Sequence, residues 1–409
     1  DVAARARRRL ARRLLPFLFL LYVIAFLDRV NVAPEILAQT GPKVLDIICK
    51  RGDTVRGLAV DPADPRRVWA GSRTGRLYQT GDGGETWSEV SYAGAEDVKG
   101  APIASVALAG KDPGRVLVAH RSLGIFLSPD GGKSWSRVLP QKGTFTVAFA
   151  PSDSKLCYAG AAGGKVFRSA DGGRSWVDAG KGLPEKMAVR ELAVDPRDAR
   201  KVLGIGSEGW GGWFCQSSDG GASWITMRPK MKIDPTGNPT LPADPSNGDL
   251  SSPTNLCLNP KNPDELFISG NWRNAYSADG GKTWEERSRG ADISVIEDIQ
   301  FHGGKVYAVA MDEGLLASSD QGATWSQLYP LRWVDETSGH QWRVRIWDEG
   351  GRTRILSTDS PWNGKYPNKI LRSDDGGQAF QADAVGLPAC VPAKNTMWGR
   401  SYPRGLAQD

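Results

Sequence analysis

The sequence of 409 residues is poor in the side chains that most often bind metals or form disulfides. It has only three histidines, and its five cysteines are an odd number at wide, unequal intervals. The cysteines are Cys49, Cys157, Cys215, Cys257 and Cys390. Neither residue type has the spacing of a zinc site, and the cysteines do not form a dense disulfide framework. We therefore expect free thiols, no bound metal and no cofactor.

An excess of positive charge is absent from most of the chain. The formal net charge is +6, but the six arginines and one aspartate of residues 1–13 account for +5, which leaves +1 for all other residues. A nearly neutral body argues against a surface that follows nucleic-acid phosphates. The basic start favours a membrane-targeting flank, and we expect no nucleic-acid partner.

Long hydrophobic runs are also scarce. Residues 14–27 have no charged side chain, and Asp28 ends this run. The run is shorter than the about 20 residues that span a bilayer, and its length is typical of an export signal or a short signal anchor. We therefore interpret residues 1–40 as a basic and hydrophobic signal or anchor segment with a short helix. The prediction is a periplasmic or extracellular protein, free or anchored to the membrane through this segment.

Residues 12–32 resemble the first transmembrane helix of major-facilitator transporters, most closely in Phe-Leu-Asp-Arg-Val-Asn at residues 26–31. A transporter of that type needs many further apolar helices, and no other such segment follows. Transport is therefore excluded for this chain.

An internal repeat is what the sequence does contain. The pattern Ser/Thr-x-Asp-x-Gly-x-Thr/Ser-Trp, known as the Asp-box, occurs six times and a seventh time in weakened form. Its aspartates are Asp82, Asp130, Asp171, Asp219, Asp279, Asp320 and Asp375. Their mean spacing of about 49 residues is the length of one four-stranded propeller blade. We predict an all-β, seven-bladed β-propeller over residues 41–409.

The chemistry of the Asp-box favours a structural role over catalysis or calcium binding. Aspartate can accept hydrogen bonds from the amides of its own turn, and the glycines can adopt positive φ. The Thr/Ser hydroxyl can close the hairpin, and the tryptophan begins the next strand in a half-buried position.

The last residues repeat an earlier strand. Arg-Gly-Leu-Ala-Gln-Asp at 404–409 is almost identical to residues 56–61, in the first predicted strand. Either this segment closes the ring as a swapped strand or the natural protein continues. Residues 44–49 are a spare strand that could close the ring instead.

The seven Asp-boxes resemble the propellers of sialidases, two-propeller xyloglucanases, sortilin-type receptors and a related photosystem II assembly factor. The resemblance implies the fold, but that group contains enzymes, receptors and assembly factors. Sialidase activity is disfavoured because the Arg-Ile-Pro signature is absent and no Tyr/Glu pair stands out, with Tyr402 the nearest candidate. Xyloglucanases place two carboxylates in a groove between two propellers, and this chain has one propeller.

Aligning the inner strands on their Asp-Pro turns suggests where a ligand would bind. The residues that share one register are Arg56, Ala104, Phe145, Arg190, Thr254, Glu297, Trp342 and Arg404. The three arginines would meet near the axis and could clamp a carboxylate. Alternatively, Arg56, Glu191, Glu297 and Asp298 form ion pairs at the channel mouth.

Tryptophans and carboxylates supply further candidates. Trp210, Trp213, Trp333 and Trp342 could form platforms for sugar rings. If the protein is a glycosidase, the candidate carboxylates are Asp244, Asp249, Glu297 and Asp298.

We predict an exported binding or assembly module for a glycan or protein partner. The alternative is a glycoside hydrolase that uses two carboxylates. An enzyme should present two carboxylates opposed across a tryptophan-lined pocket, whereas a binding module should lack them.

Overall fold

The computed structural model describes residues 55–61, 63–72, 74–83, 86–92, 98, 100–234, 249–270, 273–291, 295–311, 313–329, 341–359, 369–383 and 406–407. The predicted signal or anchor segment and the spare strand at residues 44–49 lie outside this part of the chain. Within it, none of the helices has the length and apolar character needed to cross a membrane.

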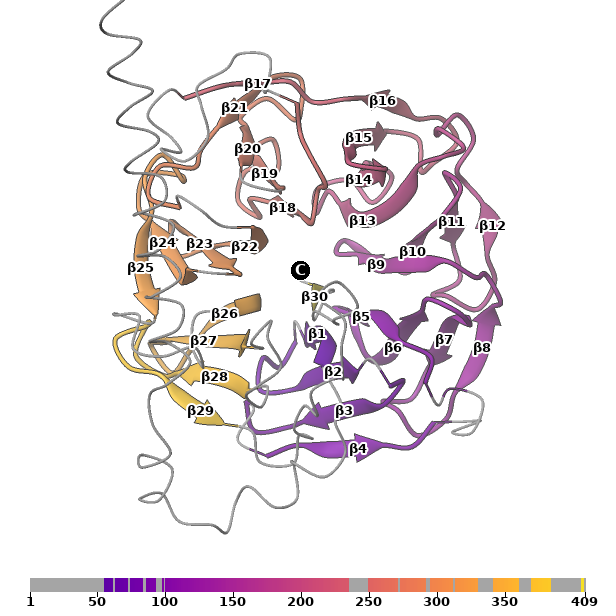
Figure 1. The fold of residues 1–409 in the computed structure, drawn as a ribbon. Helices are drawn as coiled ribbons and strands as arrows, with labels where there is room; N and C mark the ends of the chain where they lie inside the picture. The colour runs from indigo at the N-terminus through magenta and orange to yellow at the C-terminus, as the bar shows by residue number, and fades with distance from the viewer. Residues whose placement is uncertain are drawn as a thin grey trace, which may run out of the picture.

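Seven antiparallel sheets surround a central axis, so the predicted all-β, seven-bladed propeller is confirmed (Figure 1). Each sheet contains four antiparallel strands that follow one another from the axis to the rim, and two of the sheets have a fifth strand. The first blade contains β1 (Val55–Val60), β2 (Val68–Ser72), β3 (Leu77–Thr80) and β4 (Ser88–Val90).

The other six blades repeat this order. Their strands are β5 (Ile103–Ala109), β6 (Asp112–His120), β7 (Gly124–Ser128) and β8 (Ser136–Leu139); β9 (Thr144–Ala150), β10 (Asp153–Ala161), β11 (Val166–Ser169) and β12 (Val177–Asp178); β13 (Ala188–Val194), β14 (Val202–Glu208), β15 (Gly211–Ser217) and β16 (Ile225–Met227); β18 (Asn255–Leu258), β19 (Leu266–Ser269), β20 (Asn274–Ser277) and β21 (Trp284–Glu286); β22 (Ile296–His302), β23 (Lys305–Ala310), β24 (Gly314–Ser318) and β25 (Ser326–Tyr329); and β26 (Gln341–Glu349), β27 (Arg352–Asp359), β28 (Lys369–Ser373) and β29 (Gln381–Asp383).

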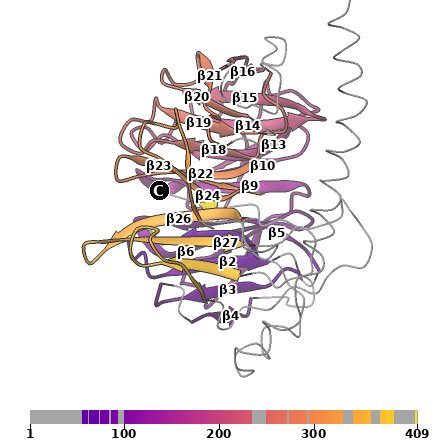
Figure 2. The same cartoon turned by 60° about the vertical axis from the view of Figure 1, so that its left-hand side comes forward.

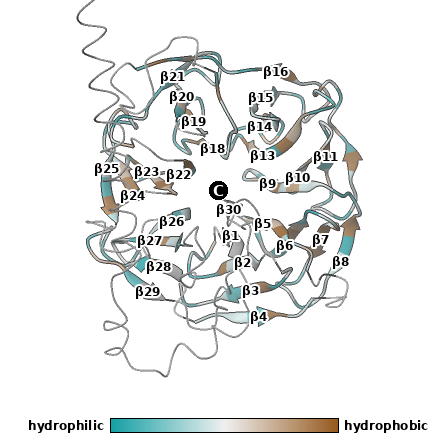
Figure 3. Ribbon diagram, in the orientation of Figure 1, coloured by the Kyte–Doolittle hydropathy of each residue, from teal (hydrophilic) through white to brown (hydrophobic). Residues whose placement is uncertain are grey.

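Apolar side chains fill the spaces between blades. Hydrophobic residues gather on the strands, and hydrophilic residues are frequent in the connections (Figure 3). The ring closes because Leu58 and Tyr78 of the first blade share one buried cluster with Trp347 and Leu356 of the last. The turned view likewise places β27 beside β2 (Figure 2). Radial packing therefore buries both faces of sheets that could not hide them alone.

Two short strands extend blades by parallel pairing. β17 (Met231–Lys232) lies on the rim beside β21. β30 (Leu406–Ala407) lies on the axial side of β1. Leu406 pairs with Leu58 and Ala407 with Ala59, so the two copies of the repeated sequence pair with each other in register. This pairing makes β30 a fifth strand of the first blade.

The Asp-box is a hairpin whose polar contacts are local. Asp171 accepts hydrogen bonds from the hydroxyls of Ser169 (2.8 Å) and Ser175 (2.6 Å) and from the Ser175 amide (2.9 Å). These donors, the Ser175 hydroxyl first, lower the pKa of Asp171 to about 2. Gly172 and Gly173 have φ of 74° and 90°, which L-residues rarely adopt. The aspartate thus holds a turn that glycine makes accessible.

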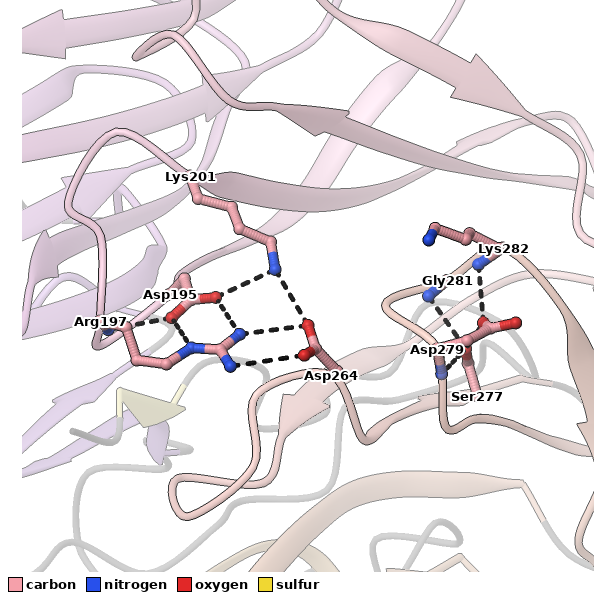
Figure 4. Close-up of polar contacts among 8 residues, drawn as sticks. All are labelled: Asp195, Arg197, Lys201, Asp264, Ser277, Asp279, Gly281 and Lys282. Carbon is pink, nitrogen blue, oxygen red and sulfur yellow. Dashed lines mark hydrogen bonds and ion pairs between the residues drawn. The ribbon is translucent and has the colours of Figure 1, made fainter.

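Polar contacts on the Asp-box side also join neighbouring blades. Figure 4 shows the fifth Asp-box, at Asp279, near an ion-pair cluster between the fourth and fifth blades. There Arg197 contacts Asp195 at 2.8 Å and Asp264 at 3.1 Å. Lys201 contacts the same two carboxylates at 3.1 and 3.2 Å.

The seventh Asp-box lacks one contact that the others have. In the fifth box the Thr283 hydroxyl donates to Asp279 at 2.6 Å, whereas alanine occupies the equivalent position 379. We predict that Thr283→Val lowers the free energy of unfolding by about 0.5–1 kcal/mol, because one exposed hydrogen bond is lost. Ala379→Ser should raise it. Urea denaturation of both variants tests this, and an unchanged midpoint for Thr283→Val would contradict it.

Candidate functional site

The inner strands of six blades begin with a β-bulge at the same place. The extra, unpaired residues are Arg56, Ala104, Phe145, Arg190, Glu297 and Trp342. The register predicted from the Asp-Pro turns is therefore confirmed at these positions. A bulge changes the direction of the side chains around it, so residues that share a register in different blades need not point the same way.

The residues after these bulges form a ring around the channel. We call this set the inner polar ring: Ser105, Thr146, Glu191, Asn255, Asp298 and Arg343. Each comes from the inner strand of its own blade. Five of them follow a bulge, and Asn255 follows Thr254, where no bulge is described. Their side chains lie where each blade meets the next.

Most members of the inner polar ring accept a backbone N–H of the next blade. Glu191 accepts from Leu256 at 2.9 Å, and Asn255 accepts from Ile299 at 3.2 Å. Asp298 accepts from Val344 at 3.0 Å. The axial edge of an inner strand has no neighbouring strand in these blades, and its amides need acceptors. The ring supplies them.

The sixth and seventh blades are also joined by buried charges. Arg345 donates to Asp298 at 2.9 Å, and both side chains are almost fully buried. Arg343 donates through Nη1 to the carbonyls of Glu297 and Trp342, each at 2.6 Å. The Glu297 carboxylate lies 3.9 Å from the same Nη1. Removing one partner of such a pair leaves a buried charge and is strongly destabilising.

A cavity of about 160 Å³ occupies the channel along the second to seventh blades. At the end where the inner strands begin, its wall is polar and contains Arg190, Glu191, Asn255 and Arg343. Toward the opposite end the wall is apolar and is made by the later residues of the same inner strands. These include Leu108, Ala148, Ala193 and Leu258. The channel is therefore amphipathic along its length.

An aromatic ring with two guanidinium groups lies at the polar end. The Arg190 guanidinium carbon is 4.5 Å from the Phe145 ring centroid, and that of Arg121 is 5.1 Å from it. Arg190 also donates to Ser207 at 3.0 Å. The Gly143 amide donates to the Arg121 carbonyl at 2.6 Å, which ties the β6–β7 turn to the start of β9. We call Arg121, Phe145 and Arg190 the mouth cluster.

Glu191 is the acid whose environment stands out. Burial raises its pKa to about 8, the nearby Asp298 also raises it, and Arg343, Arg345 and the Leu256 amide oppose the shift. The pKa of this carboxyl therefore lies near neutral pH. The described cavity wall holds four arginines and the two acids Glu191 and Asp298.

The structure separates the sequence-predicted site residues. Arg190 reaches the cavity. Trp210 is 72 % exposed on the β14–β15 turn. The guanidinium carbon of Arg228 lies over Trp213, 4.1 Å from its ring centroid. Asp249 is exposed beside Lys230. The side chain of Arg56, and Asp244, Trp333 and Arg404 entirely, lie outside the described residues.

Trp342 corrects the prediction of a binding platform at that position. Its side chain is fully buried, at the bulge between Gln341 and Arg343. Glu297 and Asp298 are buried as well. Glu297 lies beside Arg343, and Asp298 accepts from Asn255, Arg345 and the Val344 amide. None of the three presents a surface to bulk solvent.

Sequence reasoning missed Arg121, Arg343 and Arg345. Arg121 lies in a hairpin outside the repeated motifs, and no pattern points to it. The alternation Arg343-Val-Arg345 in an inner strand was a usable signal, because charges seldom occur on strands buried on both faces.

Comparisons with known proteins agree on the repeat and the fold. Residues 275–286 match the BNR/Asp-box repeat family. The structure of YCF48 bound to D1 peptide is similar to this chain, with a TM-score of 0.56 and 19 % sequence identity. The similarity covers 80 % of this chain and 95 % of the YCF48 chain. YCF48 from Cyanidioschyzon merolae has a TM-score of 0.58 and 15 % sequence identity, and the similarity covers 81 % of this chain and 98 % of the YCF48 chain.

An ancestral GH74 enzyme gives a TM-score of only 0.43 at 14 % identity, covering 83 % of this chain and 63 % of that one. A search of curated protein sequences found no match. At these identities the likeness shows the fold alone. None of the matches supports the resemblance of residues 12–32 to a transporter helix.

We predict a pH-dependent effect of Glu191→Gln. The glutamine can still accept the Leu256 amide but cannot ionise. The folded-state pKa of Glu191 is raised above its ordinary 4.5. The contribution of Glu191 to the stability of the wild type is therefore fully present below pH 4.5 and is lost as the pH rises through about 8. The variant should therefore become more stable than wild type over that window.

Urea denaturation at intervals from pH 4 to 9 measures this difference. Glu89→Gln, on the exposed outer strand of the first blade, is the matched control and should show no such trend. Parallel pH profiles for wild type and Glu191→Gln would refute the assignment.

Proposed function

We propose that the protein is a binding or assembly module that holds an acidic segment of a protein partner at the mouth cluster. The carrying observation is that two guanidinium groups lie over one phenylalanine ring at the polar end of the channel. Guanidinium groups bind carboxylates through paired hydrogen bonds, and an aromatic ring offers an apolar contact beside them.

The surrounding charge supports an anionic ligand. Four arginines and two acidic side chains line the described cavity wall, so positive charge exceeds negative charge there whether or not Glu191 is ionised. A similar fold binds the D1 peptide in YCF48. That likeness favours a peptide partner over other acidic ligands.

The hydrolase alternative has less support. Among the described residues that line the cavity there is no tryptophan. Its two carboxylates, Glu191 and Asp298, both accept backbone N–H groups of the next blade. A glycosidase needs one carboxyl for proton transfer and another as nucleophile or base across the substrate. Carboxyls committed to the scaffold do not meet that need.

Peptide binding can be tested by fluorescence polarisation with labelled acidic peptides and their Glu→Gln, Asp→Asn counterparts. We predict that Arg121→Gln with Arg190→Gln weakens binding of acidic peptides at least tenfold. Arg200→Gln is the matched control, because Arg200 is exposed on the Asp-box side of the ring. Equal binding by wild type and the double variant would contradict the proposal.

A glycan and polysaccharide panel separates the remaining outcomes. Retention without release of reducing sugar would replace the peptide with a glycan partner. Release of reducing sugar would establish a hydrolase.

We further propose that the protein is exported. The support is the basic residues 1–13 followed by the uncharged run 14–27. Residues 1–40 fused to a phosphatase that is active only outside the bacterial cytoplasm should give activity, and Leu20→Arg should abolish it. Equal activity of the two fusions would refute export through this segment.

A further inference from the structure

We propose that the channel also binds a small monocarboxylate with a short apolar tail, its carboxylate on Arg343 and its tail along the apolar half. This site lies inside the channel rather than at the mouth cluster. It does not rest on the proposed peptide binding, since it uses a different arginine and a ligand of a different class.

Arg343 provides the head-group site. In the described part of the chain its hydrogen bonds are all made by Nη1, to the carbonyls of Glu297 and Trp342. The side chain is 5 % exposed and lines the cavity. Its Nε and Nη2 donors are therefore available for a ligand. A carboxylate accepts two parallel hydrogen bonds from such a fork.

The charge around Arg343 favours an anion. The nearest carboxylate, that of Glu297, is 3.9 Å from Nη1, outside hydrogen-bond distance. Asp298 is bound by Arg345 and the Val344 amide. The charge of Arg343 is shared with Glu297 and Glu191 but neither accepts a hydrogen bond from it, and a bound carboxylate would do so.

The rest of the cavity fits an apolar tail. Ala148 and Ala193 keep the channel open because their side chains are small, and both are partly exposed to it. Leu108 and Leu258 complete this apolar wall. A cavity of about 160 Å³ holds on the order of ten water-sized groups, enough for an acid of about six carbons.

Isothermal titration of the full chain with acetate, butyrate, hexanoate and 1-hexanol tests both halves of the site. Affinity should rise along the acid series, with hexanoate at least tenfold tighter than acetate, because each buried methylene favours binding. 1-Hexanol, which lacks the charge, should bind at least tenfold more weakly than hexanoate. Equal affinities for acetate and hexanoate, or for hexanoate and hexanol, would overturn the proposal.

Variants locate the site. Arg343→Gln should abolish hexanoate binding, and Arg343→Lys should retain part of it. Ala193→Leu should weaken hexanoate at least tenfold while leaving acetate unchanged. Arg200→Gln, exposed on the Asp-box side of the ring, is the matched control and should bind hexanoate as wild type does. Loss in Arg121→Gln with retention in Arg343→Gln would place the ligand at the mouth and overturn the inner site. If the Arg343 variants do not fold, the affinities of the wild-type protein for the three acids and 1-hexanol still test the proposal.

Discussion

The architecture depends on one repeated contact, in which an inner-strand side chain of one blade accepts a backbone N–H of the next. Glu191, Asn255 and Asp298 make this contact at successive seams. It satisfies amides that have no neighbouring strand in the sheet and sets the depth at which each blade meets the next. Arg343 cannot make the contact, because a guanidinium has no acceptor. At that seam β30 covers the axial edge of β1 instead.

The same contact determines which polar side chains of the channel can bind a ligand. The contact between blades needs acceptors, so the carboxyls of the inner polar ring belong to the scaffold, whereas Arg343 gives the scaffold only Nη1. A channel built in this way is cationic without any run of basic sequence. The near-neutral body of the chain therefore does not conflict with a preference for anions.

The blade count and the bulge register could be predicted because both depend on motifs repeated in the sequence. Side-chain directions could not, since the bulge breaks the period-2 alternation on which such predictions depend. Glu297 and Trp342 share the predicted register with Arg190 and are nevertheless buried. The residues that matter lie one position later, as Arg343 does, or in a hairpin without a repeated pattern, as Arg121 does. Their proximity arises only when the ring closes.

The pairing of Leu58–Ala59 with Leu406–Ala407 joins two distant segments of the chain at the axial edge of the first blade. The entropy of closing so long a loop grows only slowly with its length, but contacts of this separation form late in folding. Loss of this pairing would expose the axial edge of β1 to any strand of matching sequence.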